Sequence, residues 1–185
     1  AAGGVQVPVF QGRWASALLD IADFSIANER ATGHARLKVS RLEDASALSG
    51  TPLAGAIDLE IVADPAAAGQ RLTVRLDGTG LRAGTIGVAG LEARGTVDRP
   101  GPELALDATL SANGLAGVAD LSSAKVTAKG ALQDMVVAVQ ANGRETRATL
   151  EASLQKAGEE LAVALRRFDG SYRAIPVALA SPGRI

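Results

Sequence analysis

The sequence predicts an all-β protein, an elongated and curved antiparallel sheet with few or no helices. Apolar residues alternate with polar or small ones, most clearly over residues 104–111 and 135–139. This two-residue period is that of a strand with one buried face. Both stretches run into Asn-Gly, at Asn113-Gly114 and Asn142-Gly143, the dipeptide that favours two-residue hairpin turns. Aromatic residues make up only 3% of the chain, which favours a thin, elongated sheet over a thick globule.

Composition excludes several classes of function. The net charge is −1 and the basic residues are dispersed, which argues against a nucleic-acid surface. The chain has no cysteine, so neither a disulfide frame nor a thiolate metal site is available. No apolar run approaches the roughly 18 residues of a membrane span. The N-terminus has neither an initiator Met nor a signal peptide, so we expect a piece of a longer protein whose anchor lies outside it.

The first half of the chain alternates between expected strands and short connectors. Residues 18–26 are apolar but out of strict phase, so a bulge and a short helix are equally compatible with them, and residues 43–50 form a connector with one helical turn. Asp64-Pro65 is expected to stop a strand because proline has no N–H for the ladder. Asp77-Gly78 predicts another hairpin turn. Strands are expected over residues 5–10, 35–42, 57–61 and 72–76.

The second half continues the pattern but contains one ambiguous segment. Strands are expected over residues 86–97, 104–110, 124–129, 135–139 and 175–179. Residues 146–167 fit helical spacing, through Leu150, Leu154, Leu161 and Leu165. The same residues also fit two strands around Lys156-Ala-Gly158. The surrounding β pattern favours the hairpin.

A loose internal repeat accompanies these strands. Gly80-Leu81 and Gly114-Leu115 are 34 residues apart and each follows an alternating stretch, and Gly143 follows Gly114 by 29 residues. Self-similarity at this spacing indicates stacked supersecondary units, each of which buries its apolar face only against its neighbours.

The candidates for catalytic or metal-binding chemistry are few. His34 is the only histidine, and its neighbours Gly33 and Arg36 favour a solvated residue in a turn over a metal ligand or catalytic base. Asp58 and Glu60 share one face of a strand and could bind a cation or act as an acid/base pair. The polar, solvated side of that strand is the favoured interpretation, because the same alternation recurs elsewhere without paired acids.

Three further features have structural explanations. Gly78-Thr-Gly80 is only part of a dinucleotide fingerprint and opens no helix, so turn glycines are expected. Arg166-Arg167 could contact phosphate, but adjacent arginines on a strand point to opposite faces, which favours a solvated pair. Trp14 could be an interfacial anchor, although packing at the end of the sheet is favoured.

The C-terminal part carries a family resemblance. Residues 161–172, then Ile175-Pro-Val-Ala-Leu179 and the Pro-containing end at residues 181–185, resemble the TamB family of the translocation and assembly module. Residues 121–130, followed by a second apolar strand, are similar to the strand-glycine-strand sequence pattern that this family repeats. The resemblance is densest over residues 72–185 and thin before residue 50.

Membership of this AsmA-like, repeating β-groove family would imply a long taco-like trough with an apolar interior. Residues 1–185 would be a single β-groove segment of a larger, inner-membrane-anchored protein that spans the periplasm. The resemblance also implies an outer-membrane barrel partner, TamA, together with phospholipid transport toward the outer membrane or assistance to outer-membrane protein assembly. No cofactor is implied. Strand phase selects the candidate groove residues for phospholipid acyl chains: Ile57, Leu59, Ile61, Leu72, Val74, Leu76, Leu104, Leu106, Leu110, Val137 and Val139.

Two other functions remain open at the level of sequence. A closed β-sandwich or solenoid could bind a protein partner by an edge strand, and it would have a dry, filled core and no lipid. An enzyme is the least favoured class, because the chain has one histidine, no cysteine and no recognisable site.

Overall fold

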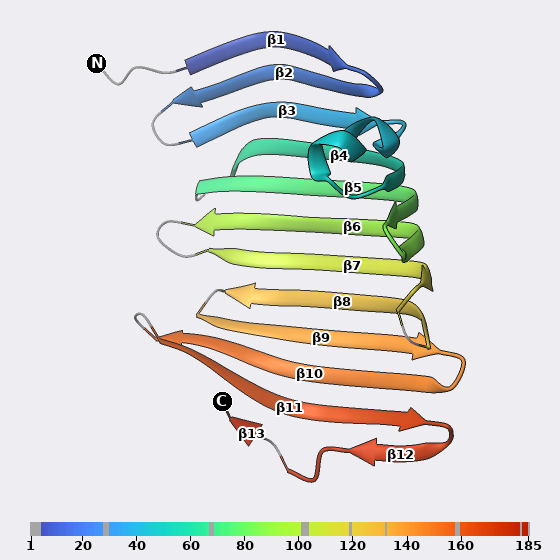
Figure 1. Cartoon of the computed structure of the whole chain (residues 1–185). Helices are drawn as coiled ribbons and strands as arrows, with labels where there is room; N and C mark the ends of the chain where they lie inside the picture. Colours follow the sequence, from blue (N-terminus) through green and yellow to red (C-terminus); the bar gives the residue numbers. More distant parts are fainter. Residues whose placement is uncertain are drawn as a thin grey trace.

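The computed structural model describes residues 5–27, 30–66, 69–100, 104–118, 120–131, 133–157, 160–181 and 183–184. They form one curved antiparallel sheet that does not close on itself (Figure 1). Each strand from β1 to β12 pairs with the next in sequence, and β13 pairs with β11. The strands are β1 (Val5–Trp14), β2 (Ala17–Ala27), β3 (Arg30–Val39), β4 (Leu53–Ala66), β5 (Gly69–Ala83), β6 (Ile86–Pro100), β7 (Ala105–Ala116), β8 (Leu121–Ala131), β9 (Asp134–Gly143), β10 (Thr146–Ala157), β11 (Glu160–Tyr172), β12 (Ile175–Ala178) and β13 (Gly183–Arg184).

The predicted fold class is confirmed, and the closed sandwich is not what forms. The ambiguous segment at 146–167 is a hairpin, in which β10 pairs with β11. The connector at 43–50 carries a 3₁₀ turn, η1 (Leu42–Ala45), and one short helix, α1 (Ser46–Ser49). In the out-of-phase segment the bulge is the correct alternative, since the β2–β3 register shifts between Ala22 and Ser25.

This sheet has almost no interior. Among the described residues no large side chain is fully buried, and the most buried ones are Ser153, Ala63 and Ala152, at 2%, 6% and 8% exposure. The accessible surface is 11977 Å², whereas a compact monomer of 18.7 kDa would expose about 8,300 Å². The extra accessible surface is expected for a single-layer sheet, because no second layer covers either of its faces.

Two predicted hairpin turns lie inside strands instead. Asp77-Gly78 is in the middle of β5, opposite Glu92 and Leu91 of β6. Asn113 lies in β7, opposite Gly90. Asp64-Pro65 does not stop β4 either, because pairing with β5 continues to Ala66. The Asn142-Gly143 prediction is nearly correct, since this dipeptide ends β9 directly before the turn at residues 144–145.

The misplaced glycines mark a level of the sheet at which the alternation changes phase, and this level explains the internal repeat. Gly80 and Gly114 have φ of 58° and 60°, and the register places them at the same level of β5 and β7, on either side of Ala89 in β6. The register of β6 with β5 and with β7 continues unchanged past this level, whereas the β4–β5 register shifts there, between Ala54 and Ala56. Beyond the glycines Leu81 stands on the apolar face beside Gly78, and Leu115 is at the same level of β7. The 34-residue spacing is the length of one two-strand unit of the sheet.

Replacing Gly114 by Ala is expected to lower the free energy of unfolding by about 2–5 kcal/mol. The new Cβ would lie 2.4 Å from the Cβ of Ala89, and overpacking of about 1–3 kcal/mol adds to the left-handed penalty of about 1–2 kcal/mol. Gly84→Ala is the matched control, because Gly84 has φ of 57° and its Cβ would meet only Thr51, at 4.0 Å. Urea denaturation measures both. Equal losses in the two variants would show that the close approach to Ala89 adds no cost at Gly114.

Candidate functional site

One face of the sheet is apolar across ten neighbouring strands. Residues directly opposite one another in an antiparallel pair share a face, so the register identifies every member. From β2 to β11 the central positions of this face are occupied by Ala, Val, Leu, Ile, Met, Phe or Gly alone. One row across the sheet consists of Leu19, Leu37, Leu59, Leu76, Ala93, Leu110, Val126, Val139, Leu150 and Phe168.

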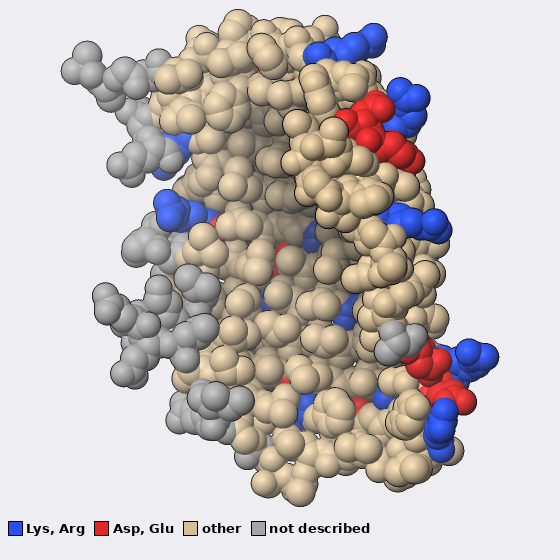
Figure 2. Space-filling model, in the orientation of Figure 1, with Lys and Arg blue, Asp and Glu red and all other residues tan. Residues whose placement is uncertain are grey.

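This apolar face is the hollowed one. Figure 2 shows it almost entirely tan, with Lys, Arg, Asp and Glu concentrated along its edges. Neighbouring strands lie about 4.8 Å apart, and successive residues on the same face of a strand lie about 6.7 Å apart. Ten strands with about three such steps each therefore give this face an area of about 1,000 Å². Soluble monomers rarely expose a continuous apolar patch of more than a few hundred Å². We call this surface, the apolar face of β2–β11, the trough.

Ten of the eleven predicted groove residues stand on the trough, on β4, β5, β7 and β9. In register, Leu59 lies opposite Leu76 and Ile61 opposite Val74. Leu104 is the exception, since it directly precedes β7. The prediction selected large side chains and so omitted the Ala and Gly residues of the same alternation. These Ala and Gly residues would have been included if every residue on the same face of each predicted strand had been selected.

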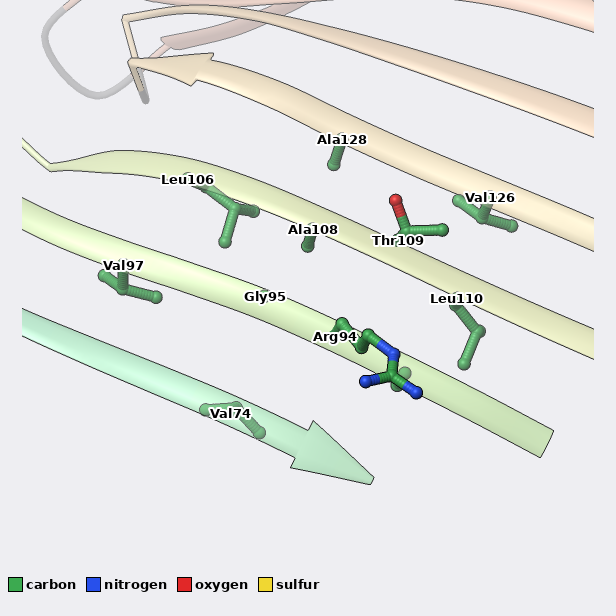
Figure 3. Close-up of a pocket in the computed structure, with 11 residues that line it drawn as sticks. Val74, Arg94, Gly95, Val97, Leu106, Ala108, Thr109, Leu110, Val126 and Ala128 are labelled. Carbon is green, nitrogen blue, oxygen red and sulfur yellow. The ribbon is translucent and has the colours of Figure 1, made fainter. Parts of the chain in front are cut away.

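Small residues form the floor of one depression in the trough. Gly95, Ala108 and Ala128 are neighbours in register on β6, β7 and β8. They form the floor of a depression of about 250 Å³, with Val97 and Leu106 on one side and Leu110 and Val126 on the other (Figure 3). Its lining is apolar apart from Arg94 and Thr109, which pair with each other at positions of the opposite alternation. The depression follows from a row of side chains too short to fill the space between two rows of larger ones.

The η1–α1 connector stands at the rim of the trough, in front of β4 in Figure 1. Hydrogen bonds fix both of its ends. The Ser16 amide donates to the Asp44 carboxylate at 3.1 Å, and the Leu53 amide donates to the Ser46 hydroxyl at 2.9 Å. In Figure 2 the trough is most deeply hollowed beside this connector.

The opposite face carries a ladder of cross-strand ion pairs. Arg36 donates to both carboxylate oxygens of Asp58, at 2.8 and 2.6 Å. His34 lies in β3 rather than in the predicted turn, and its Nε2 lies 3.0 Å from Glu60 Oε1. Asp58 and Glu60 are therefore on the solvated side of β4, as expected. Lys129 pairs with Asp107 at 3.0 Å, so the ladder runs along much of the sheet.

The Arg36–Asp58 pair predicts a pH dependence of stability. The hydrogen bonds from Arg36 lower the pKa of Asp58, although Asp77 lies directly opposite in register. A lowered folded-state pKa gives stability that is present above the unfolded value of about 3.9 and is lost as the pH falls through the folded value.

We therefore expect Arg36→Gln to lose less stability than the wild type between pH 6 and pH 3, starting from a lower value at pH 6. Chemical denaturation at both pH values provides the measurement. Arg82→Gln is the control, because Arg82 has no ion-pair partner among the described residues. If Arg36→Gln and the wild type show the same acid dependence, the pair does not set it.

The remaining predicted features have structural roles. Gly78 and Gly80 lie within β5 rather than in a turn, and Gly80 lies where the β4–β5 register shifts. Arg166 is the extra residue of a bulge between β10 and β11, and Arg167 pairs with Asp169. Trp14 ends edge strand β1 and is 53% exposed, so it stands at the end of the sheet without being packed there.

Fold and site together define an open-faced β-sheet protein with an apolar trough on one side and a charged ladder on the other. No family model, curated protein or solved structure was found to match the chain. Within the described part of the chain no helix is long and apolar enough to span a membrane. The described residues also contain no group of three His, Cys, Asp or Glu side chains that could hold a metal ion.

Proposed function

We propose that the chain is a segment of a TamB-like protein and that its trough carries phospholipid acyl chains. The supporting observation is the unbroken apolar face of ten strands, which the described part of the chain leaves without a covering layer. An apolar surface of about 1,000 Å² in water is unfavourable at about 25 cal/mol per Å². Acyl chains would remove that cost without needing any specific polar contact.

The shape of the trough supports the same occupant. Its floor is made of Gly and Ala where the depression lies, and its walls are Val and Leu. An acyl chain is a narrow apolar rod that fits such a furrow, whereas a folded protein domain needs a broader complementary surface. The small residues would thus explain both the shortage of aromatics and the room for a ligand.

The cellular setting in this proposal comes from the family resemblance. The segment would belong to an inner-membrane-anchored protein in the periplasm, with a TamA-like outer-membrane barrel protein as partner. Its transport would run toward the outer membrane, and it would assist the assembly of some outer-membrane proteins. The proposal assigns no catalytic role and no cofactor.

Native mass spectrometry of the chain purified without detergent tests the proposal. We expect phospholipid adducts on a folded protein, and their displacement by an added short-chain phospholipid. A folded chain that carries no lipid after purification and takes up none from vesicles would overturn the lipid proposal.

A second candidate function is strand addition by a partner protein. Edge strand β1 exposes Val9, Phe10 and Trp14, at 68%, 48% and 53%, and an unpaired edge can accept a further strand. In this case amide hydrogen exchange in β1 would slow when an unfolded outer-membrane protein segment is added. Exchange that slows only in trough residues would favour lipid instead.

A further inference from the structure

Two turns lie side by side at one rim of the trough. The β9–β10 turn contains Arg144 and Glu145, and the β11–β12 turn contains Arg173 and Ala174. They are neighbours because β10 and β11 pair up to Thr146 and Tyr172. The Arg173 amide donates to the Glu145 carbonyl at 2.9 Å, which ties one turn to the other.

Three arginines surround the hollow beside these turns. It measures about 340 Å³ and is lined by Arg144, Arg147 and Arg173, and also by Glu145 and Ser171. Arg147 and Ser171 are opposite each other in register, and alternation places both on the polar face, so the hollow lies on the outer side of the rim. Figure 2 shows charged side chains gathered at this lower right rim, where β9 and β10 meet in Figure 1. We call this group the rim cluster.

The arginines of the rim cluster are not equivalent. Arg173 is held in place, since its Nε donates to Glu145 Oε2 at 2.7 Å and its guanidinium lies 5.3 Å from the centre of the Tyr172 ring. Arg144 and Arg147 have no acidic partner among the described residues. Two guanidinium groups are therefore free to bind an anion. Guanidinium binds phosphate oxygens in a bidentate manner, which makes a phosphate group the best match.

The rim cluster also lies beside a narrow apolar stretch of the trough. On the apolar face, the last row matched across β9, β10 and β11 is Ala141, Ala148 and Gly170, and Thr146 and Tyr172 follow on β10 and β11 directly before the turns. The small side chains of this row and the ring of Tyr172 connect the rim to the trough. This connection is short, since Ala148 and Thr146 are separated by about 7 Å along the strand.

We propose that the rim cluster binds the phosphate group of a lipid whose acyl chains pass over the rim, beside Tyr172, into the trough. This inference rests on the proposed lipid-carrying function. It gives the bound lipid an orientation, with the head group at the rim formed by the β9–β10 and β11–β12 turns. It also predicts a preference for lipids that carry a phosphate group.

The test compares two lipids that differ only in the phosphate, dihexanoyl phosphatidate and dihexanoylglycerol. Isothermal titration measures the Kd of each for the wild type, for Arg144→Gln/Arg147→Gln and for the matched double variant Arg82→Gln/Arg99→Gln. The matched variant removes the same charge from exposed arginines outside the cluster. We expect the wild type to bind the phosphatidate about tenfold more tightly, since two charge-assisted contacts are at stake. This preference should vanish only in Arg144→Gln/Arg147→Gln.

Each contrary result separates one claim from another. Equal affinity for the two lipids in the wild type would overturn the rim cluster as a head-group site and leave the trough proposal intact. Binding of neither lipid would overturn both proposals. Glycerol 3-phosphate that binds as tightly as the phosphatidate, and is lost in Arg144→Gln/Arg147→Gln, would show a site for free phosphate and overturn the lipid form of the inference.

Discussion

Replacing Val74 or Leu106 by Asp is expected to lower the amount of bound phospholipid at least about tenfold. Both side chains line the depression in the trough, and Leu106 pairs with Val97 across β6 and β7. Each substitution removes an apolar contact of about 1.5–3 kcal/mol and places a carboxylate against the acyl chain. Because both positions are only partly buried in the free protein, the fold should survive.

The matched controls stand on the same strand but on the opposite face. Thr73→Asp puts the same charge next to Val74, at a position that pairs with Val62 and Thr96 on the polar face. Arg75→Ala removes a member of the ion-pair ladder, since Arg75 donates to Asp77 at 2.8 Å. Lipid adducts are counted by native mass spectrometry, and circular dichroism confirms that each variant is folded. Equal occupancy in all four variants would contradict the trough as the lipid site.

Alternation was sufficient to predict which side chains share the trough. A strand has only two faces, so the phase of Ile57, Leu59 and Ile61 fixes their side once a strand is assumed. A thin, elongated sheet also followed from the sequence, because the scarcity of aromatics leaves little with which to fill a second layer. Its curvature was implied only by the family resemblance, and whether the apolar face is open was not predicted. These inferences use local periodicity, which a single sequence contains in full.

The phase changes within strands could not be predicted because their signal is shared with turns. Gly114 supplies a positive φ, which a hairpin turn and an irregularity within a strand can both use. What separates the two is whether pairing continues beyond the glycine, as it does with β6, and that depends on the partner strand rather than on β7. Leu115 was the available hint, since an apolar residue in the shifted phase indicates that the strand resumes beyond the glycine.

The rim cluster was missed for a different reason. Arg144, Arg147 and Arg173 are brought together by the pairing of β10 with β11, and nothing in the local sequence links the first two to the third. The adjacent pair Arg166-Arg167 attracted attention instead, although Arg167 is engaged with Asp169. A cluster of residues that strand pairing brings together can be predicted only when the strand order and register are known.

Filling the furrow should also prevent lipid binding, although it makes the trough more apolar. Ala108 lies between Gly95 and Ala128 on the floor of the depression, whose volume is about 250 Å³. In Ala108→Phe the ring would occupy this space and cover apolar side chains, so stability should stay the same or rise slightly. We expect bound phospholipid to fall about fivefold or more, because the ring takes the place of the acyl chain instead of repelling it.

Ser111→Phe is the control, since Ser111 stands on the opposite alternation of β7, pairs with Glu92 and Lys125 and does not line the depression. It adds the same aromatic surface outside the trough and should leave lipid occupancy unchanged. The two Asp variants test whether the trough must be apolar, whereas Ala108→Phe tests whether it must be hollow. Occupancy that stays constant or rises in Ala108→Phe would mean that lipid adheres to the sheet by general hydrophobicity. The row of Gly95, Ala108 and Ala128 would then have no part in lipid binding. Its role would be limited to packing between the larger side chains on either side of it.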